Sequence, residues 1–199
     1  MRRSEFEVKD EAAIEELLAE CEYGTLSLVD DGEPYGVPVN FVWFGGCICF
    51  HGSREGRKAE VIAKNPKAAF SAVKPYSLIP SHFSNTRAAC PATQFFASVH
   101  MAGTVTIVEE TSEKCGVLNA MMQKLQPEGG YETIDATNPI YTKMTAQTAV
   151  WKLTPSHKSL KVKAGQNLSD ERKCEIIRKL IDRGEELDKI TVQTIQNNS

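Results

Sequence analysis

A short segment between residues 50 and 58 carries the residue types that could hold a phosphate group. It reads Phe-His-Gly-Ser-Arg-Glu-Gly-Arg-Lys, with Arg57 and Lys58 side by side directly after Gly56. A strand-like sequence precedes it and a helix-like one follows, so the free backbone N–H groups of a helix start would point at the anion. Gly56 would let the anion approach, and the guanidinium and ammonium would add two cations of different geometry. The segment predicts a phosphate-binding site. The alternative interpretation is a solvated basic turn.

The elements before this segment must bring it to the end of a strand. Residues 9–22 carry apolar residues at helical spacing, with Asp10 placed to cap a helix. Turn sequences at 30–32 and 45–46 then separate three stretches rich in β-branched and aromatic residues, which predicts an antiparallel meander. These strands are expected at residues 25–29, 35–44 and 47–51. Because proline cannot donate to a strand ladder, Pro34 and Pro38 predict that the second strand is an edge, bulged or irregular strand.

The rest of the chain continues the pattern of strands with flanking helices. Residues 74–93 hold three prolines with little periodicity and are expected to form a long loop. From about residue 169 a charged amphipathic helix is expected to run to about 187, with a partly solvated tail to Ser199. The remaining elements are a helix at 54–65, strands at 67–73, 95–109, 148–153 and 160–163, and a helix at 112–126. About six strands, mostly in hairpin order, favour a small barrel over a doubly wound sheet.

The composition restricts the class of protein. The chain has 199 residues, of which 41% are hydrophobic and 25% charged, as expected for one globular domain. Its formal net charge of −3 offers no general attraction for nucleic acid or anionic lipid. The apolar run at 41–50 is broken by two glycines and is too short to span a membrane. The charged stretch at 5–11 argues against a secretory signal, and the six cysteines lack paired spacing, so reduced thiols and a cytoplasmic location are expected.

Several motifs, taken together and in order, resemble a known family. They lie at residues 23–26, 35–41, 50–58, 65–66 and 96–105. This order resembles the FMN-binding split barrels related to pyridoxamine 5'-phosphate oxidase, specifically their nitroimidazole-resistance-like branch. The resemblance implies an α+β fold, mainly β with flanking helices, in which an antiparallel six-stranded split β-barrel occupies residues 1–165. Residues 166–199 would then be a C-terminal helical extension.

The resemblance also implies which residues hold the cofactor, FMN. Arg57 and Lys58 would hold its phosphate. Ser98 falls where the pyridoxamine oxidases often carry a glutamine, so it could donate a hydrogen bond to FMN or to a bridging water; otherwise it is an outward-facing serine. The ribityl chain and ring edge would be lined by Phe50, His51 and Gly52, and the isoalloxazine would face Val39 and Asn40.

The same resemblance implies a homodimer with FMN in clefts at the subunit interface. A barrel of this size encloses too little volume for a flavin beside its own core, so a second subunit is a sensible second wall. Trp151 could contribute to that wall or simply pack in the core. The Arg-x-His cluster with which pyridoxamine oxidases grip their substrate is missing after Trp151. Oxidation of pyridoxamine phosphate is therefore not expected.

Two further groups of residues could carry chemistry. Cys47, Cys49 and His51 alternate along one strand and would share a face, as in a partial metal site. A fourth ligand is not identifiable, so small buried thiols and no metal are expected. His100 should share a face with Ser98 and could act as a proton donor; the alternative is an ordinary surface or packed histidine.

These observations favour an FMN-binding flavoprotein acting as an oxidoreductase. It would reduce a small acceptor such as a nitroaromatic or quinone-like compound, with the redox chemistry supplied by the flavin. The alternative is a non-catalytic protein that binds or senses FMN or haem. Neither interpretation involves nucleic acid or a membrane.

Overall fold

The computed structural model describes residues 3–84 and 86–197. Within these residues the chain forms eight strands, six α-helices and two 3-10 helices. The strands are β1 (Glu7–Val8), β2 (Tyr23–Asp30), β3 (Glu33–Asn40), β4 (Val42–Phe44), β5 (Cys47–Gly52), β6 (Lys67–Ile79), β7 (Thr93–Ile107) and β8 (Ala149–Lys163). The helices are α1 (Glu11–Glu20), α2 (Arg57–Lys64), α3 (Thr111–Leu125), α4 (Pro139–Gln147), α5 (Asp170–Arg183) and α6 (Glu186–Asn197), with 3-10 helices η1 (Ser4–Phe6) and η2 (Ser81–Phe83).

The strands form one sheet in the order β3-β2-β6-β7-β8-β5-β4, and β1 pairs with β8. The pairs β2–β3, β2–β6, β4–β5, β5–β8 and β1–β8 are antiparallel. This arrangement confirms the predicted α+β split barrel with flanking helices. The predicted count of six strands was wrong, because the described residues form eight.

The predicted meander is broken at Phe41. The stretch expected as one strand at 35–44 forms β3 and β4, which stand at opposite ends of the strand order. Phe41, between them, is buried and packs edge-to-face on Phe70 with ring centroids 4.7 Å apart. Burial of this ring accounts for the break, because the chain must leave the β2 ladder to place it. The prolines at 34 and 38 lie in β3, which is an edge strand as predicted.

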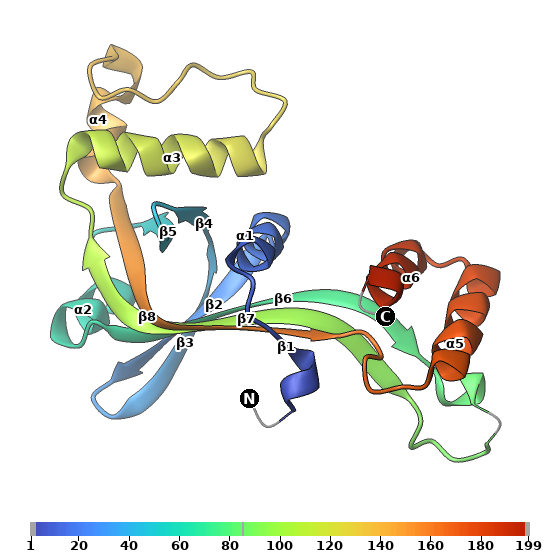
Figure 1. The fold of residues 1–199 in the computed structure, drawn as a ribbon. Coiled ribbons are helices and arrows are strands. Elements are labelled where there is room, and N and C mark those ends of the chain that lie inside the picture. Colours follow the sequence, from blue (N-terminus) through green and yellow to red (C-terminus); the bar gives the residue numbers. More distant parts are fainter. Residues whose placement is uncertain (1–2, 85, 198–199) are drawn as a thin grey trace. The chain divides into compact units, whose positions relative to one another are not determined.

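The chain forms two compact units. The first unit contains the residues up to Ala13, Val73–Val99 and the residues from Ser159 onward. The second unit contains Ile14–Ala72 and His100–Lys158. In the second unit, α2 packs against β2 and α3 packs against β4 (Figure 1). This unit contains the segment at residues 50–58.

Three further segments differ from the sequence predictions. The expected loop at 74–93 begins as strand, because β6 continues to Ile79 and buries Tyr76 and Ser77. The expected strands at 148–153 and 160–163 are one strand, β8. The helix α4 was not predicted, although Asn138 caps it by accepting from the Ile140 N–H at 3.0 Å and Pro139 occupies its first turn.

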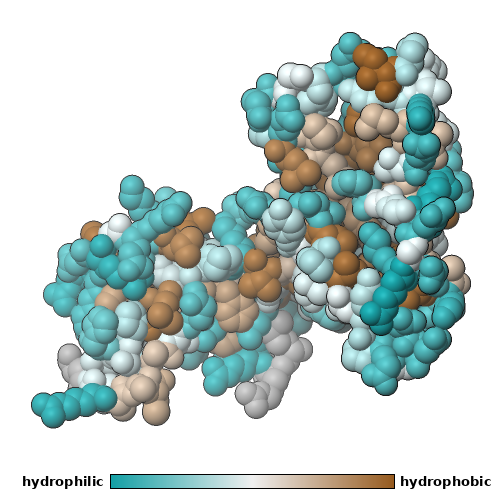
Figure 2. Space-filling model, turned by 180° about the vertical axis from the view of Figure 1, so that it is seen from behind, coloured by the Kyte–Doolittle hydropathy of each residue, from teal (hydrophilic) through white to brown (hydrophobic). Residues whose placement is uncertain are grey.

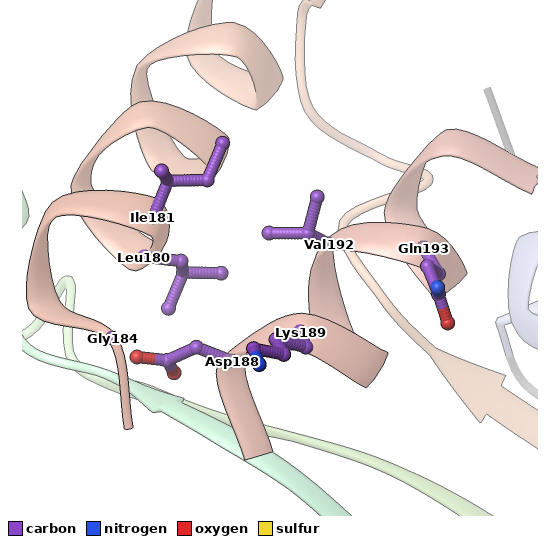
Figure 3. Close-up of a pocket in the computed structure, with 7 residues that line it drawn as sticks. All are labelled: Leu180, Ile181, Gly184, Asp188, Lys189, Val192 and Gln193. Atoms are coloured by element: carbon purple, nitrogen blue, oxygen red, sulfur yellow. The ribbon is translucent and has the colours of Figure 1, made fainter. Parts of the chain in front are cut away.

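The C-terminal segment of the first unit is a pair of helices rather than one helix and a tail. Gly184 ends α5 in the left-handed conformation, with φ 69°, and α6 follows from Glu186. Leu180 and Ile181 of α5 point towards Val192 of α6 across a hollow of about 340 Å³ (Figure 3). The last two residues of the predicted tail, 198 and 199, lie outside the described residues. Among the described residues, none of the helices has the length and apolar content needed to cross a membrane.

Candidate functional site

The segment at residues 50–58 joins the end of β5 to the start of α2, as predicted. Gly56 precedes the first helical residue with φ 98°, and no side chain caps the helix there. A Cβ at Gly56 would meet nothing within 4 Å, so the backbone conformation rather than crowding favours glycine. The first N–H groups of α2 therefore have no side-chain acceptor and can receive an anion.

Arg57 is oriented by two neighbours from the β2–β3 hairpin. Its Nε donates to the Asp30 carboxylate at 2.9 Å, and its guanidinium carbon lies 4.3 Å from the centre of the Tyr35 ring. The Arg57 side chain is nevertheless 60% exposed. The sequence pattern identified Arg57 but neither partner, because Asp30 and Tyr35 are more than twenty residues away along the chain.

Lys58 lies over the end of β5. Its ammonium is 5.2 Å from the centre of the Phe50 ring, and a Cβ added to Gly52 would come within 2.8 Å of its Nζ. Gly52 therefore makes room for the ammonium. Burial lowers the pKa of Lys58, and burial followed by the charge of Lys58 lowers the pKa of His51. His51 is consequently neutral at pH 7, and an arriving anion would favour the protonated form of Lys58.

The other residues expected around the ring are placed differently. Phe50 is fully buried and packs edge-to-face on Trp151, with centroids 6.4 Å apart, so its side chain belongs to the core. Val39 is buried in β3, and the Asn40 side chain donates to the Glu22 carbonyl at 3.2 Å. Strand β3, which carries Val39 and Asn40, contacts β5, which carries His51 and Gly52, although the two strands are not neighbours in the strand order.

Ser98 and His100 lie on β7 but fall in different units. Ser98 is half-buried and belongs to the first unit, so the structure does not relate it to Arg57 and Lys58. His100 is exposed in the second unit, and its Nδ1 pairs with the Ser71 hydroxyl at 3.1 Å. Strand β6 thus fixes one side of this imidazole.

The cysteine pair of β5 is part of the core. Cys47 and Cys49 are buried in an apolar cluster that includes Val117 and Met121 of α3. Burial, followed by the neighbouring Cys47, raises the pKa of Cys49 to about 12, which keeps its thiol protonated. The prediction of small buried thiols is confirmed. Within residues 3–84 and 86–197, the structure groups no three His, Cys, Asp or Glu side chains as ligands for a metal ion.

An apolar pocket that the sequence did not reveal borders α2. It has a volume of about 460 Å³ and is lined by Arg54, by Ala59, Ile62 and Ala63 of α2, and by Val105–Ile107 and Trp151. Trp151 is 5% exposed, and its indole nitrogen is a buried donor that has no hydrogen-bond partner among the described residues. A buried unpaired donor is costly unless another group satisfies it. Together with the cations at the start of α2, these features fit a group that combines a phosphate with an apolar ring.

Comparison with known proteins agrees with this geometry. Residues 10–162 match the family model described as pyridoxamine 5'-phosphate oxidase. No curated protein sequence matches the chain.

Solved structures with the same fold extend over most of the chain. A candidate 5-nitroimidazole antibiotic resistance protein from Bacteroides thetaiotaomicron is 22% identical, with a TM-score of 0.63 over 78% of this chain and 86% of that one. The flavocytochrome Anf3 from Azotobacter vinelandii is 20% identical, with a TM-score of 0.65 over 79% and 69%. An FAD- and haem-binding protein from Mycobacterium smegmatis is also 20% identical, with a TM-score of 0.65 over 79% and 73%. The family model spans most of the chain and these structures share its fold, so the chain belongs to the pyridoxamine 5'-phosphate oxidase family.

Proposed function

We propose that this protein binds FMN and uses it to reduce a small acceptor such as a nitroaromatic or quinone-like compound. The observation that carries the proposal is the uncapped start of α2 with Arg57 and Lys58 in its first turn. Two of the structural neighbours are a flavocytochrome and an FAD- and haem-binding protein, which supports flavin as the ligand class. The neighbour linked to 5-nitroimidazole resistance supports a nitroaromatic acceptor.

The residues of the chain would divide the work of holding the cofactor. Arg57 and Lys58 bind the phosphate, together with the first N–H groups of α2. Val39, Asn40, His51 and Gly52 would face the ring from two contacting strands. The family resemblance alone supports Ser98 as a hydrogen-bond donor to the flavin. The bound flavin supplies the two-electron redox chemistry. His100, held by Ser71, is the candidate proton donor to the acceptor.

A second copy of the chain would complete the site. The interior of the second unit is filled by its own side chains, including the fully buried Phe41, Phe50 and Phe70. This packing supports a flavin ring that lies outside this core. We therefore propose a homodimer in which the partner covers the flavin, and we place this homodimer in the cytoplasm.

The alternative is a non-catalytic protein that stores or senses FMN or haem. The two neighbours associated with haem favour this second candidate over other binding functions. The absorption spectrum of the purified protein separates them, because a flavin gives broad near-ultraviolet and blue bands whereas haem gives a sharp Soret band. Turnover of reduced nicotinamide with nitrobenzene as acceptor then separates an enzyme from a flavin-binding protein.

The test of the binding site is the double variant Arg57→Ala and Lys58→Ala. Each charge-assisted bond to a phosphate contributes about 1.5–3 kcal/mol, so the double variant should bind FMN at least about a hundredfold more weakly. Lys64→Ala is the matched control, because Lys64 lies on the same helix and makes only an exposed ion pair with Asp31 at 3.2 Å. FMN affinity is measured by titration and the released molecule is identified by mass. Equal FMN affinity of the double variant and the control would refute the proposed site.

A further inference from the structure

A second apolar pocket lies in the second unit between α3, α4 and the end of β5. We call it the methionine pocket and define it by Leu118, Met121, Met122 and Leu125 of α3, Met144 of α4, and His51. Its volume is about 220 Å³. His51 is its link to the proposed FMN site, because Gly52, the next residue, adjoins the ammonium of Lys58.

The walls of the methionine pocket are held in place by hydrogen bonds to the backbone of two lining residues, Ile134 and Thr145. The Asn119 side chain of α3 donates to the Ile134 carbonyl at 2.9 Å and accepts from the Ile134 N–H at 2.8 Å. The buried ammonium of Lys114 in α3 donates to the Thr145 carbonyl of α4 at 3.1 Å. The first set of bonds ties α3 to the segment that leads into α4, and the second ties α3 to α4 itself, as expected of a pre-formed pocket.

Apolar side chains around the methionine pocket remain open to solvent. Met144 is 60% exposed, Leu125 is 47% exposed, and Ile140, next to Tyr141 of the lining, is 59% exposed. Figure 2 shows apolar surface in the upper part of the molecule, which holds α3 and α4. Methionine side chains adapt to ring-shaped ligands and make favourable contacts with aromatic rings. Three of them in one pocket favour an aromatic occupant.

Size and charge restrict that occupant further. An apolar cavity of about 150 Å³ is enough for one benzene ring, whereas drug-sized ligands need about 300–1,000 Å³. The methionine pocket falls between these values, so it suits a single substituted ring and is too small for a flavin. Its described lining contains no Lys, Arg, Asp or Glu, and the depressed pKa of His51 leaves this imidazole neutral at pH 7. A phosphate or carboxylate would find no counter-charge there.

We propose that the methionine pocket binds the electron acceptor, and that this acceptor is an uncharged molecule built on one aromatic or quinone-like ring. The role of the bound molecule as electron acceptor rests on the proposed function. The pocket and its preference for neutral rings rest on the geometry alone. The neutral His51 imidazole provides the hydrogen-bonding group at the end of the pocket that adjoins Lys58, so an acceptor bound here would face His51 and not His100, which does not line the pocket.

The experiment follows the methionine methyl groups by NMR in the purified protein. The chain has 5 methionines, and nitrobenzene is titrated into protein labelled at their methyl carbons. We expect saturable shifts of the Met121, Met122 and Met144 signals, assigned by single Met→Leu changes. Met101 is the internal reference, because it is fully buried in β7 and does not line the pocket. No saturable shift of the pocket methionines, or equal shifts at Met101, would overturn the proposal.

A charge placed at the rim gives a matched pair of variants. Met144→Lys should weaken nitrobenzene binding at least tenfold and strengthen binding of 4-nitrobenzoate, because the new ammonium faces the added carboxylate. The control Ile181→Lys adds the same charge to a side chain that is 64% exposed on α5, and it should change neither affinity. Sedimentation is run on all samples. A change in oligomeric state of Met144→Lys without any change in ring affinity would make this surface an interface between copies and overturn the proposal.

The flavin content of the same samples keeps this test separate from that of the proposed function. Protein that lacks flavin but shows the methyl shifts keeps the pocket and refutes the proposed function. Protein that contains flavin but shows no methyl shifts keeps the proposed flavin binding and refutes the acceptor pocket.

Discussion

Replacing Gly103 by alanine should disrupt the contact between β7 and β8 in the second unit. A Cβ at Gly103 would lie 2.9 Å from both the Thr154 carbonyl carbon and the Pro155 Cα, and closer still to the Thr154 carbonyl oxygen. All three atoms belong to the backbone of β8 and cannot rotate away. Because carbon atoms pack best at about 3.5–4.0 Å, one strand would have to move by about 0.6 Å or more. The motif at 96–105 thus contains a glycine for a steric reason.

The loss of stability should be large because these backbone atoms cannot move away from the added Cβ. Overpacking in a well-packed interior typically costs about 1–3 kcal/mol, and a backbone contact belongs at the upper end, so we expect Gly103→Ala to lower the free energy of unfolding by about 3 kcal/mol. Gly36→Ala in β3 is the matched control, because its Cβ would lie 3.7 Å from the Thr25 methyl group. The control should be neutral or stabilise slightly, since alanine restricts the unfolded chain.

Urea denaturation followed by circular dichroism measures both variants. Equal m-values would show that the two free energies refer to the same transition. If Gly103→Ala and Gly36→Ala unfolded at free energies within about 0.5 kcal/mol of each other, the steric explanation of Gly103 would be refuted.

Two further predictions concern buried charges. Asp188 of α6 is 2% exposed and accepts hydrogen bonds from Ser77 at 2.6 Å and from two nitrogens of Arg183. Asp188→Ala should therefore lower the free energy of unfolding in urea by about 3–5 kcal/mol. Removal of the exposed Lys64–Asp31 pair should lower it by less than about 1 kcal/mol. Equal costs would contradict this. Burial lowers the pKa of Lys124 from 10.5 to about 8. Because the unfolded chain then binds the proton more tightly than the folded chain, the free energy of unfolding should rise between pH 8 and 10.5, by on the order of 3 kcal/mol. Lys124→Met should lack this rise, and parallel pH profiles of the two proteins would rule the explanation out.

The sequence was informative where the signal is local. The alternation along 25–29 and the prolines of the edge strand β3 act within a few residues, and both were interpreted correctly. The break at Phe41 was not predictable in this way, because it depends on the Phe70 ring, almost thirty residues later. The continuation of β6 past Pro75 depends on the C-terminal segment, since the Ser77 N–H donates to the Thr191 hydroxyl at 2.8 Å instead of to a strand.

The same distinction applies to the sites. The cations at the start of α2 are adjacent in sequence, so the pattern identified them as a pair. The methionine pocket draws on residues between 51 and 148, and only folding brings them together. One local signal was nevertheless present: Asn138-Pro139 marks a helix start, and helix α4 supplies Met144. A pocket cannot be predicted when the helix that forms one of its walls is not recognised in the sequence.

The surroundings of Arg57 and Lys58 suit them to different parts of phosphate binding. The contact with Asp30 uses Arg57 Nε, so the carboxylate and the Tyr35 ring hold the plane of the guanidinium while its terminal nitrogens can face the anion. An exposed ion pair of this kind contributes less than about 1 kcal/mol, so it orients the guanidinium without competing seriously with a phosphate. Lys58 has no such carboxylate in its described contacts, and burial lowers its pKa. In the proposed site Arg57 would therefore set the geometry of phosphate binding, and the more buried Lys58 would contribute a charge that the anion stabilises.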